Sequence, residues 1–436
     1  MKFPLELPAT ADFHVHLRDG AMMETVVPTI EQGGVDTVYV MPNLVPPITT
    51  VAHALAYKEK LKKLTSNVNF LMTLYLHPTI TPEVIEEAAK AGIGISYPSG
   101  VTTNSSEGVL EYSQFYPVFA AMQKHGLILN LHGEVPSTPA AEYTTTGDSE
   151  PITILNAEER FLPTLKKIHA DFPDLNIVLE HCTTKAALDT VRGLGPNVAA
   201  TITAHHLWIC LDEAVGSVHN FCKPVAKSPL DRVALVKAVV SGEQKFFFGS
   251  DSAPHPLSAK VGGLKTVAGC FTQSYATSLV VSAVQEAINK GWIKEEDVTQ
   301  EKLEGFLSTY GRRFYKLPEA KEGKRIVLEK KGEVIKERVV SRDGEVKVVN
   351  FKSGDEALSS STAASLPFAI AASTLVPSAG WKRYCGATVP ATDGVWTDSY
   401  TASCSCRVPT LPIRVLRTAD LAASTLLLSI IDFGDF

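Results

Sequence analysis

The chain lacks long hydrophobic runs and blocks of one charge sign. Its apolar stretches are too short to cross a bilayer, which excludes a membrane-spanning helix. Lysine and arginine are dispersed and the formal net charge is −6, so the basic surface of a nucleic-acid-binding protein is missing. The N-terminus lacks the apolar core of a signal peptide. We therefore expect a small-molecule substrate, and neither nucleic acid nor membrane as a partner.

Cysteine is scarce, with seven in 436 residues at scattered positions. An odd number without regular spacing does not make a disulfide framework, so we expect a reducing compartment and a cytoplasmic protein. Apolar residues make up 45% of the chain and charged residues 20%, as in soluble globular proteins. The length suffices for a large hydrophobic core.

Short apolar runs alternate with amphipathic stretches up to about residue 255, in the pattern of repeated β-α units. Eight runs predict strands, at 12–17, 37–41, 70–76, 93–97, 127–131, 177–179, 198–203 and 246–248. Helix-like segments lie between them, at 52–64, 82–91, 112–125, 157–170, 185–192 and 229–240. This order predicts a (β/α)8 TIM barrel, a fold whose chemistry lies at the C-terminal ends of the strands.

The barrel domain is expected to cover residues 1–358, with further helices over 274–314. Short strands over 325–349 should close over the barrel, with turns at Lys331-Gly332 and Asp343-Gly344. Residues 359–436 differ in composition: they are rich in Ser, Thr and Ala, with one lysine and no glutamate. This stretch fits either a disordered, irregular extension or an artefact of the gene model.

The first predicted strand ends in His14-Val15-His16-Leu17-Arg18. Residues i and i+2 of a strand point to one side, so the two imidazoles face the same way and make half of a zinc site. A guanidinium at position 18 can bind a substrate carboxylate. Two histidines at a sheet end are also ordinary polar residues, so the prediction depends on matching groups elsewhere.

Matching groups follow three other predicted strands: His132 after the fifth, His181 after the sixth and Asp251 after the eighth. Parallel strands bring these ends to one barrel mouth, where we predict a zinc site. Bound zinc lowers the pKa of its water to about 7 and so supplies hydroxide. Asp251 would then act as general acid and base in hydrolysis of an amide, or in the reverse reaction.

The sequence closely resembles the dihydroorotases of the amidohydrolase superfamily, of the monofunctional type found in bacteria and fungi. The resemblance covers about residues 5–358. It is carried by His14–Gly20, Met41–Asn43, Tyr97-Pro98, Thr102–Ser105, His132–Glu134, Glu180–Thr184, His219–Lys227 and Asp251–His255.

The resemblance implies interconversion of N-carbamoyl-L-aspartate and L-dihydroorotate in pyrimidine biosynthesis, by a homodimer. It implies one zinc on His14, His16 and Asp251 and a second on His132 and His181, with Asp251 as the proton shuttle. It also implies substrate-binding roles: Arg18, Asn43 and His255 for the α-carboxylate, Thr102 and Thr103 in a closing loop, and Lys223, Ala268 and Gly269 at the ring edge.

The family carries a carboxylated lysine two residues before Tyr-Pro that bridges both metals, and Ile95 stands at that place. Without this anion two dications repel each other more strongly, so one zinc is favoured over two and activity is expected to be reduced. The chain is then a natural single-metal enzyme, a substituted dinuclear enzyme, or a silent homologue that acts as a scaffold. On this interpretation, Ile95→Lys should raise zinc content and rate.

Other readings of the site also stay open. A hydantoinase-like cyclic amidase is an alternative within the superfamily, although Arg18 and Asn43 favour an acidic substrate. His205 and His206 are interpreted as structural polar residues at the barrel rim. Cys182 and Cys270 are interpreted as packing residues, because the sequence places no base beside them.

Overall fold

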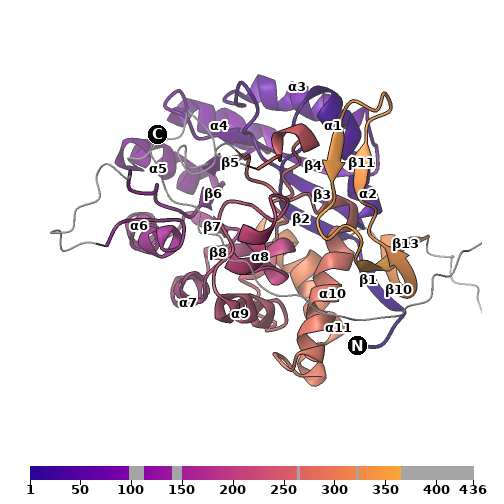
Figure 1. Cartoon of the computed structure of the whole chain (residues 1–436). Helices are drawn as coiled ribbons and strands as arrows, with labels where there is room; N and C mark the ends of the chain where they lie inside the picture. Colours follow the sequence, from indigo (N-terminus) through magenta and orange to yellow (C-terminus); the bar gives the residue numbers. More distant parts are fainter. Residues whose placement is uncertain (98–111, 140–149, 263–265, 321–323, 365–436) are drawn as a thin grey trace, which may run out of the picture. The chain divides into compact units, whose positions relative to one another are not determined.

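The computed structural model describes residues 1–97, 112–139, 150–262, 266–320 and 324–364. Eight parallel strands form one sheet in sequence order, which confirms the predicted TIM barrel (Figure 1). Each lies at or within a few residues of its predicted range. The strands are β2 (Thr10–Val15), β3 (Val35–Val40), β4 (Asn69–Tyr75), β5 (Gly94–Tyr97), β6 (Ile128–His132), β7 (Asn176–Glu180), β8 (Val198–Ile202) and β9 (Phe246–Phe248).

Helices surround these strands (Figure 1). The six predicted helices are present as α3 (Val51–Lys62), α4 (Pro82–Ala91), α5 (Tyr116–His125), α6 (Ala157–Asp171), α7 (Lys185–Gly193) and α9 (Pro229–Val239). The others are α1 (Gly20–Val26), α2 (Thr29–Gln32), α8 (Leu211–Gly216), α10 (Ala276–Asn289), α11 (Gln300–Glu304) and α12 (Tyr310–Phe314). Among the described residues, no helix combines the length and apolar composition that crossing a membrane requires.

Local sequence explains where these helices begin. Helix α9 starts with Pro229, whose fixed φ suits the first helical position. The Ser228 hydroxyl accepts a hydrogen bond from the Asp231 N–H at 3.2 Å, which satisfies a free donor of the first turn. In α3 the Thr50 hydroxyl accepts from the His53 N–H in the same way.

The barrel closes where the chain leaves β9 and meets the end of β2. The Asp251 N–H donates to the His14 carbonyl at 2.8 Å, and the His16 N–H donates to the Ser252 carbonyl at 3.0 Å. The buried Asp12 carboxylate strengthens this seam by accepting from the Ser250 N–H at 2.7 Å and from its hydroxyl at 2.6 Å. Closure therefore joins the two segments that carry the predicted metal ligands.

Aromatic side chains fill the barrel interior below this end. Phe13 and Phe247 meet edge to face, with ring centroids 5.3 Å apart. Tyr315, which directly follows α12, stacks on Phe13 at 4.5 Å and meets Tyr39 at 4.9 Å. Phe247, Phe13 and Tyr39 come from the neighbouring strands β9, β2 and β3, and the same buried cluster includes Val178 of β7 and Ala199 of β8. The interior is therefore a packed core and not a channel.

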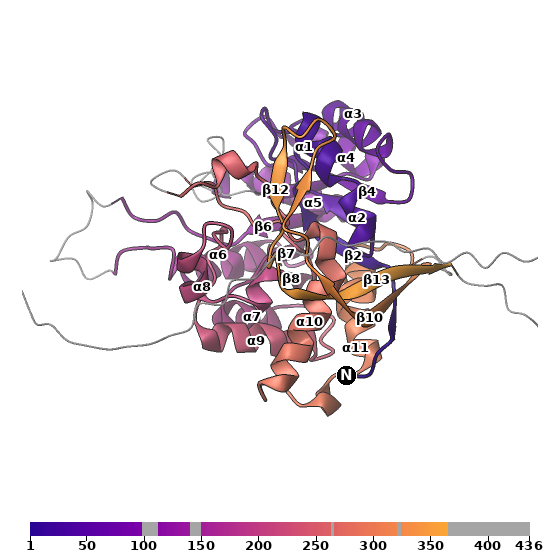
Figure 2. The ribbon, with the colours of Figure 1, turned by 45° about the vertical axis from the view of Figure 1, so that its right-hand side comes forward.

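A second sheet pairs β10 (Lys324–Val334) with β1 (Leu5–Pro8) on one side and β13 (Glu356–Ala364) on the other. Figure 2 shows β10 and β13 beside the N-terminus. The predicted turn at Lys331-Gly332 is wrong, because β10 runs through it. A register shift between Glu329 and Glu333 accommodates Gly332, whose φ is +68°.

The second predicted turn, at Asp343-Gly344, is confirmed. It joins β11 (Arg338–Val340) to β12 (Lys347–Val349), and the Gly344 N–H donates to the Ser341 carbonyl at 2.9 Å. At the C-terminal side β13 continues to Ala364, so the predicted domain end at residue 358 falls inside a strand. Most of the stretch 359–436 lies outside the described residues.

Replacing Phe247 tests the packing of the barrel interior. Phe247 is fully buried, so Phe247→Ala leaves a cavity among its aromatic neighbours and should lower the free energy of unfolding by about 3–5 kcal/mol. Urea denaturation followed by circular dichroism measures it. Val340→Ala, at a 45% exposed position, is the control and should change stability by less than about 0.5 kcal/mol. Equal stability of the two variants would contradict a packed interior.

Candidate active site

His14, His16 and Asp251 meet at the seam that closes the barrel. The Asp251 carboxylate lies 3.0 Å from Nε2 of His16 and 3.5 Å from Nε2 of His14. The ligand atoms of the three residues all lie within 4.8 Å of one another. Nitrogen and carboxylate oxygen are zinc ligands, so this group has the donors and spacing to hold a divalent cation.

The second predicted group lies directly beside the first. Nδ1 of His132 is 3.1 Å from Nε2 of His181, and both side chains are buried. The ring centroids of His14 and His181 are 5.0 Å apart, which links the two groups. The structure thus brings together all five residues predicted as metal ligands.

Three of these histidines are oriented by an oxygen on their other ring nitrogen. Glu180 lies 3.0 Å from Nδ1 of His14, and Asn43 lies 2.8 Å from Nδ1 of His16. Glu134 lies 2.8 Å from Nε2 of His132. Metal-ligating histidines are typically held in this way, because the second contact fixes ring orientation and tautomer. The surroundings of the histidines therefore fit a metal.

Backbone strain gathers at the same place. Arg18, His181 and Asp251 have φ angles of +62°, +40° and +46°. Residues with a side chain rarely adopt this left-handed region, and such strain persists where the surrounding structure enforces it. The strain therefore supports a functional role for this cluster.

Charges in the cluster suit metal binding. Burial lowers the pKa of His16 to about 4, so its imidazole is neutral at neutral pH and offers a lone pair. Burial alone would raise the pKa of Asp251, but the hydrogen bond from His16 and the neighbouring histidines hold it well below its usual range. Asp251 is therefore an anion at neutral pH.

Arg18 and His255 form a second contact pair next to the histidines. Nη2 of Arg18 lies 3.0 Å from Nε2 of His255, and its Nε donates to the Pro254 carbonyl at 3.0 Å. Burial lowers the pKa of Arg18 to about 10, so it stays positive at neutral pH. Burial and the charge of Arg18 lower the pKa of His255 to about 3, which keeps this imidazole neutral. The pair offers one fixed positive charge.

The loops after β8 and β9 also meet here. The Gly269 N–H donates to the Phe221 carbonyl at 2.9 Å, and the His255 imidazole donates a hydrogen bond to the backbone carbonyl of Ala268. Lys223, in the first loop, interacts electrostatically with Glu134. A pocket is lined in part by His255, Gly269, Val348 and Val349, so β12 reaches this region. Thr102 and Thr103 lie outside the described residues.

Ile95 points away from this cluster. Its neighbour Gly94 faces the barrel interior, because a Cβ there would lie 1.8 Å from Oη of the interior residue Tyr39. Side chains alternate along a strand, so Ile95 faces the outer layer, where it belongs to the main hydrophobic core and is fully buried. The direction of Ile95 therefore does not suit a ligand that bridges the histidines.

Sequence reasoning did not assign roles to Glu134 and Glu180, although both stand in the motifs quoted above. Glu180 contacts His14 and Glu134 contacts His132, both predicted ligands. The sequence feature that could have indicated these roles is a carboxylate within two positions of a histidine at a strand end. It also assigned Asn43 to substrate alone, whereas Asn43 contacts His16. His206 has partners on both ring nitrogens, Thr203 and the Pro224 carbonyl, as a structural residue would.

Removing the carboxylate on His14 tests the metal site. Glu180→Gln should weaken zinc affinity by roughly 10–100-fold, because His14 loses the charge that orients it. Competition with a chromophoric chelator measures the affinity. Glu158→Gln is the matched control: Glu158 is equally buried but bonds to Thr183. If both variants bind zinc as tightly as the parent chain, Glu180 does not support a metal.

Comparison with known proteins was consistent with this geometry, although no family model matches the chain. The chain is 46% identical over 367 residues to the dihydroorotase of Saccharomyces cerevisiae, covering 81% of this chain and 96% of that protein. The crystal structure of dihydroorotase from the same organism, in complex with 5-fluoroorotic acid, superposes with a TM-score of 0.75 at 44% identity. The superposed region covers 83% of this chain and 100% of the yeast chain.

A more distant structure shares only the fold. The L-hydantoinase (dihydropyrimidinase) of Arthrobacter aurescens superposes with a TM-score of 0.66 at 16% identity, covering 82% of this chain and 83% of that one. The fold, the cluster at the strand ends and the identity to the yeast enzyme over nearly its whole length agree with one another. The chain belongs to the dihydroorotase family.

Proposed function

We propose that the chain is a zinc-dependent dihydroorotase, which interconverts N-carbamoyl-L-aspartate and L-dihydroorotate. The observation that carries this proposal is the position of Arg18 and His255 beside the group His14, His16 and Asp251. A fixed positive charge next to a metal-binding and proton-accepting group suits a cyclic amide that carries a carboxylate. The 46% identity to a named dihydroorotase supports the same substrate.

The metal would be held by His14, His16 and Asp251, with His132 and His181 as ligands for a second ion. When bound, zinc would lower the pKa of a water and polarise the amide carbonyl. The oxygen contacts from Glu180, Asn43 and Glu134 would keep the imidazoles in their ligating orientation.

Asp251 would move the proton. In the hydrolytic direction, the bond between the carbonyl carbon and the ring nitrogen breaks, and a new carbon–oxygen bond forms from water. The anionic Asp251 carboxylate accepts the proton of that water and delivers it to the leaving nitrogen. Ring closure follows the same path in reverse, with water as the product.

The substrate would be held by its charges and its ring edge. Arg18, with His255 and Asn43, would bind the α-carboxylate, because the guanidinium is positive and fixed by two contacts. Lys223 and the backbone of Ala268 and Gly269 would hydrogen-bond the ring edge. Thr102 and Thr103 would belong to a loop that closes over the substrate and excludes water.

Two other functions compete with this proposal. A hydantoinase-type enzyme would accept cyclic amides without a carboxylate, and only the fold supports it. A silent scaffold needs neither Arg18 nor a proton-accepting Asp251. Arg18 contacts His255 and Asp251 contacts His16, an arrangement that suits catalysis and so favours an active enzyme.

Substrate preference separates these functions, and Arg18→Met tests the role of the arginine. The parent chain should open L-dihydroorotate far faster than 5,6-dihydrouracil, the same ring without the carboxylate. Arg18→Met should lower kcat/KM for L-dihydroorotate by at least about tenfold, because a hydrogen bond to a charged group contributes roughly 1.5–3 kcal/mol. It should leave the slow reaction with 5,6-dihydrouracil nearly unchanged.

The readout is loss of ring absorbance in the far ultraviolet for both substrates. Lys62→Met, at an exposed lysine, is the control and should retain the parent preference. Equal turnover of both rings would support a hydantoinase-type activity. No turnover of either ring by the zinc-loaded parent chain would support the scaffold.

The absence of the family's metal-bridging lysine leads to a separate prediction. Because Ile95 faces the outer core, a lysine inserted directly after Ile95 would follow the alternation of β5 and face the interior. The insertion should raise the zinc content by about one equivalent over the parent chain, since a carbamate would screen two neighbouring cations.

Ile95→Lys is the matched control for the insertion. It places the amine in the apolar outer layer and should destabilise the fold without adding zinc. The zinc content of both variants is measured by mass spectrometry after dialysis and compared with that of the parent chain. A gain with Ile95→Lys and none with the insertion would contradict the assigned direction of Ile95.

We further propose a cytoplasmic homodimer, on the resemblance to the family. The sedimentation coefficient of the purified chain tests the dimer.

A further inference from the structure

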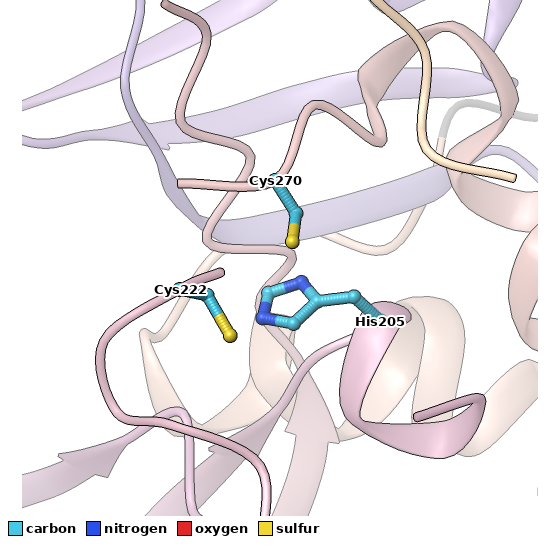
Figure 3. A group of neighbouring side chains, drawn as sticks. All are labelled: His205, Cys222 and Cys270. Atoms are coloured by element: carbon cyan, nitrogen blue, oxygen red, sulfur yellow. The ribbon is translucent and has the colours of Figure 1, made fainter. Parts of the chain in front are cut away.

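A second cluster of metal-binding side chains lies apart from the candidate active site. It consists of His205, Cys222 and Cys270, whose ligand atoms all lie within 4.8 Å of one another. All three residues are buried, with exposed fractions of 0%, 0% and 1%. Figure 3 shows the His205 ring between the two sulfur atoms. The cluster shares no residue with the group His14, His16 and Asp251.

His205 is the observation that points to a ligand. Neither of its ring nitrogens has a hydrogen-bond partner among the described residues, although the side chain is fully buried. A buried imidazole normally pairs at least one nitrogen. The adjacent His206 does so with both, through Thr203 at 2.9 Å and the Pro224 carbonyl at 3.0 Å. The surroundings can thus satisfy a histidine, and His205 is the exception.

The two thiols make weak hydrogen bonds with neighbouring groups. Sγ of Cys222 donates to the Pro224 carbonyl at 3.3 Å and lies 3.5 Å from Nε2 of His206. Sγ of Cys270 donates to the His219 carbonyl at 3.4 Å. Thiols are weak donors, so little is lost when they become metal ligands. The buried Lys260 ammonium, which donates to the Gly269 carbonyl at 2.6 Å, interacts electrostatically with both cysteines.

The chemistry of this donor set favours zinc. Two thiolates and a neutral imidazole are common ligands of tetrahedral zinc, and soft sulfur excludes calcium and magnesium. Two thiolate charges cancel the charge of Zn²⁺, so the assembly adds no net charge to the buried site. The described residues supply three ligands, which leaves one tetrahedral position for water.

We propose that His205, Cys222 and Cys270 form a separate zinc site that joins the loops after β8 and β9. Cys222 precedes Lys223, and Cys270 follows Ala268 and Gly269. The two loops are already tied by the bond from the Gly269 N–H to the Phe221 carbonyl. Zinc would therefore hold the loops at the distance that the substrate ring requires. This positioning role depends on the proposed function, whereas the metal site itself does not.

Cobalt distinguishes this site from the candidate active site. Thiolate bound to Co²⁺ gives an intense near-ultraviolet charge-transfer band, and His14, His16 and Asp251 contain no sulfur. Metal-free, reduced, full-length protein titrated with Co²⁺ should show this band. The double variant Cys222→Ser/Cys270→Ser should lose the band and bind about one Co²⁺ fewer. His205→Ala should lose it at Co²⁺ concentrations that saturate the parent chain.

Cys210→Ser is the matched control. Cys210 is also buried, but it contacts Glu213 at the start of α8, where serine is a good substitute. This variant should keep the band. Circular dichroism checks that each variant is folded, so that loss of the band reports on the ligands.

Two results would overturn the site: a folded, reduced parent chain without the band, or a band that survives in Cys222→Ser/Cys270→Ser. Thiol titration of the oxidised, denatured protein tests the competing explanation, since a disulfide between Cys222 and Cys270 would hide two thiols.

The positioning role of the metal has its own test. The double variant should raise the KM for L-dihydroorotate more than it lowers kcat, and an unchanged KM would overturn that role alone. A band in a protein without dihydroorotase activity would uphold the site and reject the proposed function.

Discussion

The seam between β2 and β9 is the constraint on which the candidate active site depends. Backbone hydrogen bonds link Asp251 to His14 and His16 to Ser252, so the bonds that close the barrel also set the ligands face to face. Asp12 reinforces this seam by binding Ser250. The aromatic contacts of Phe13 and Phe247 support the same two strands from below. Stability of the fold and geometry of the site are therefore hard to separate here.

Much of this arrangement could be predicted from the sequence. Strands alternating with helices imply a parallel barrel, and a parallel barrel brings His14, His132 and His181 to one end whatever the details of packing. The direction in which a side chain of a strand points was harder to predict. Ile95 was assigned by its distance from Tyr97, but its orientation follows from Gly94, which must face inward to leave room for Tyr39. Sequence spacing does not show which residue of a short strand faces inward.

Other details depended on contacts between distant segments. Asn43 and Glu180 orient His16 and His14, and this role emerges only when the closed barrel brings the ends of β3 and β7 to the end of β2. The glycine at 332 predicts a turn, yet pairing of β10 with β13 extends the strand and absorbs the glycine at a register shift. Cys270 was interpreted as a packing residue because the sequence places no base beside it. Its proximity to Cys222 and His205, which are remote in the sequence, depends on the fold.

The proposed mechanism requires that the cluster at the seam binds zinc and that the bound zinc supports the opening of L-dihydroorotate. The most direct test measures the rate of ring opening while zinc is returned to metal-free protein, with Asp251→Asn measured in parallel. We expect no ring opening without zinc and a rate that rises with added zinc and saturates in the parent chain, whereas the rate of Asp251→Asn stays at background. A folded, zinc-loaded parent chain without turnover, or equal rates in both proteins, would contradict it.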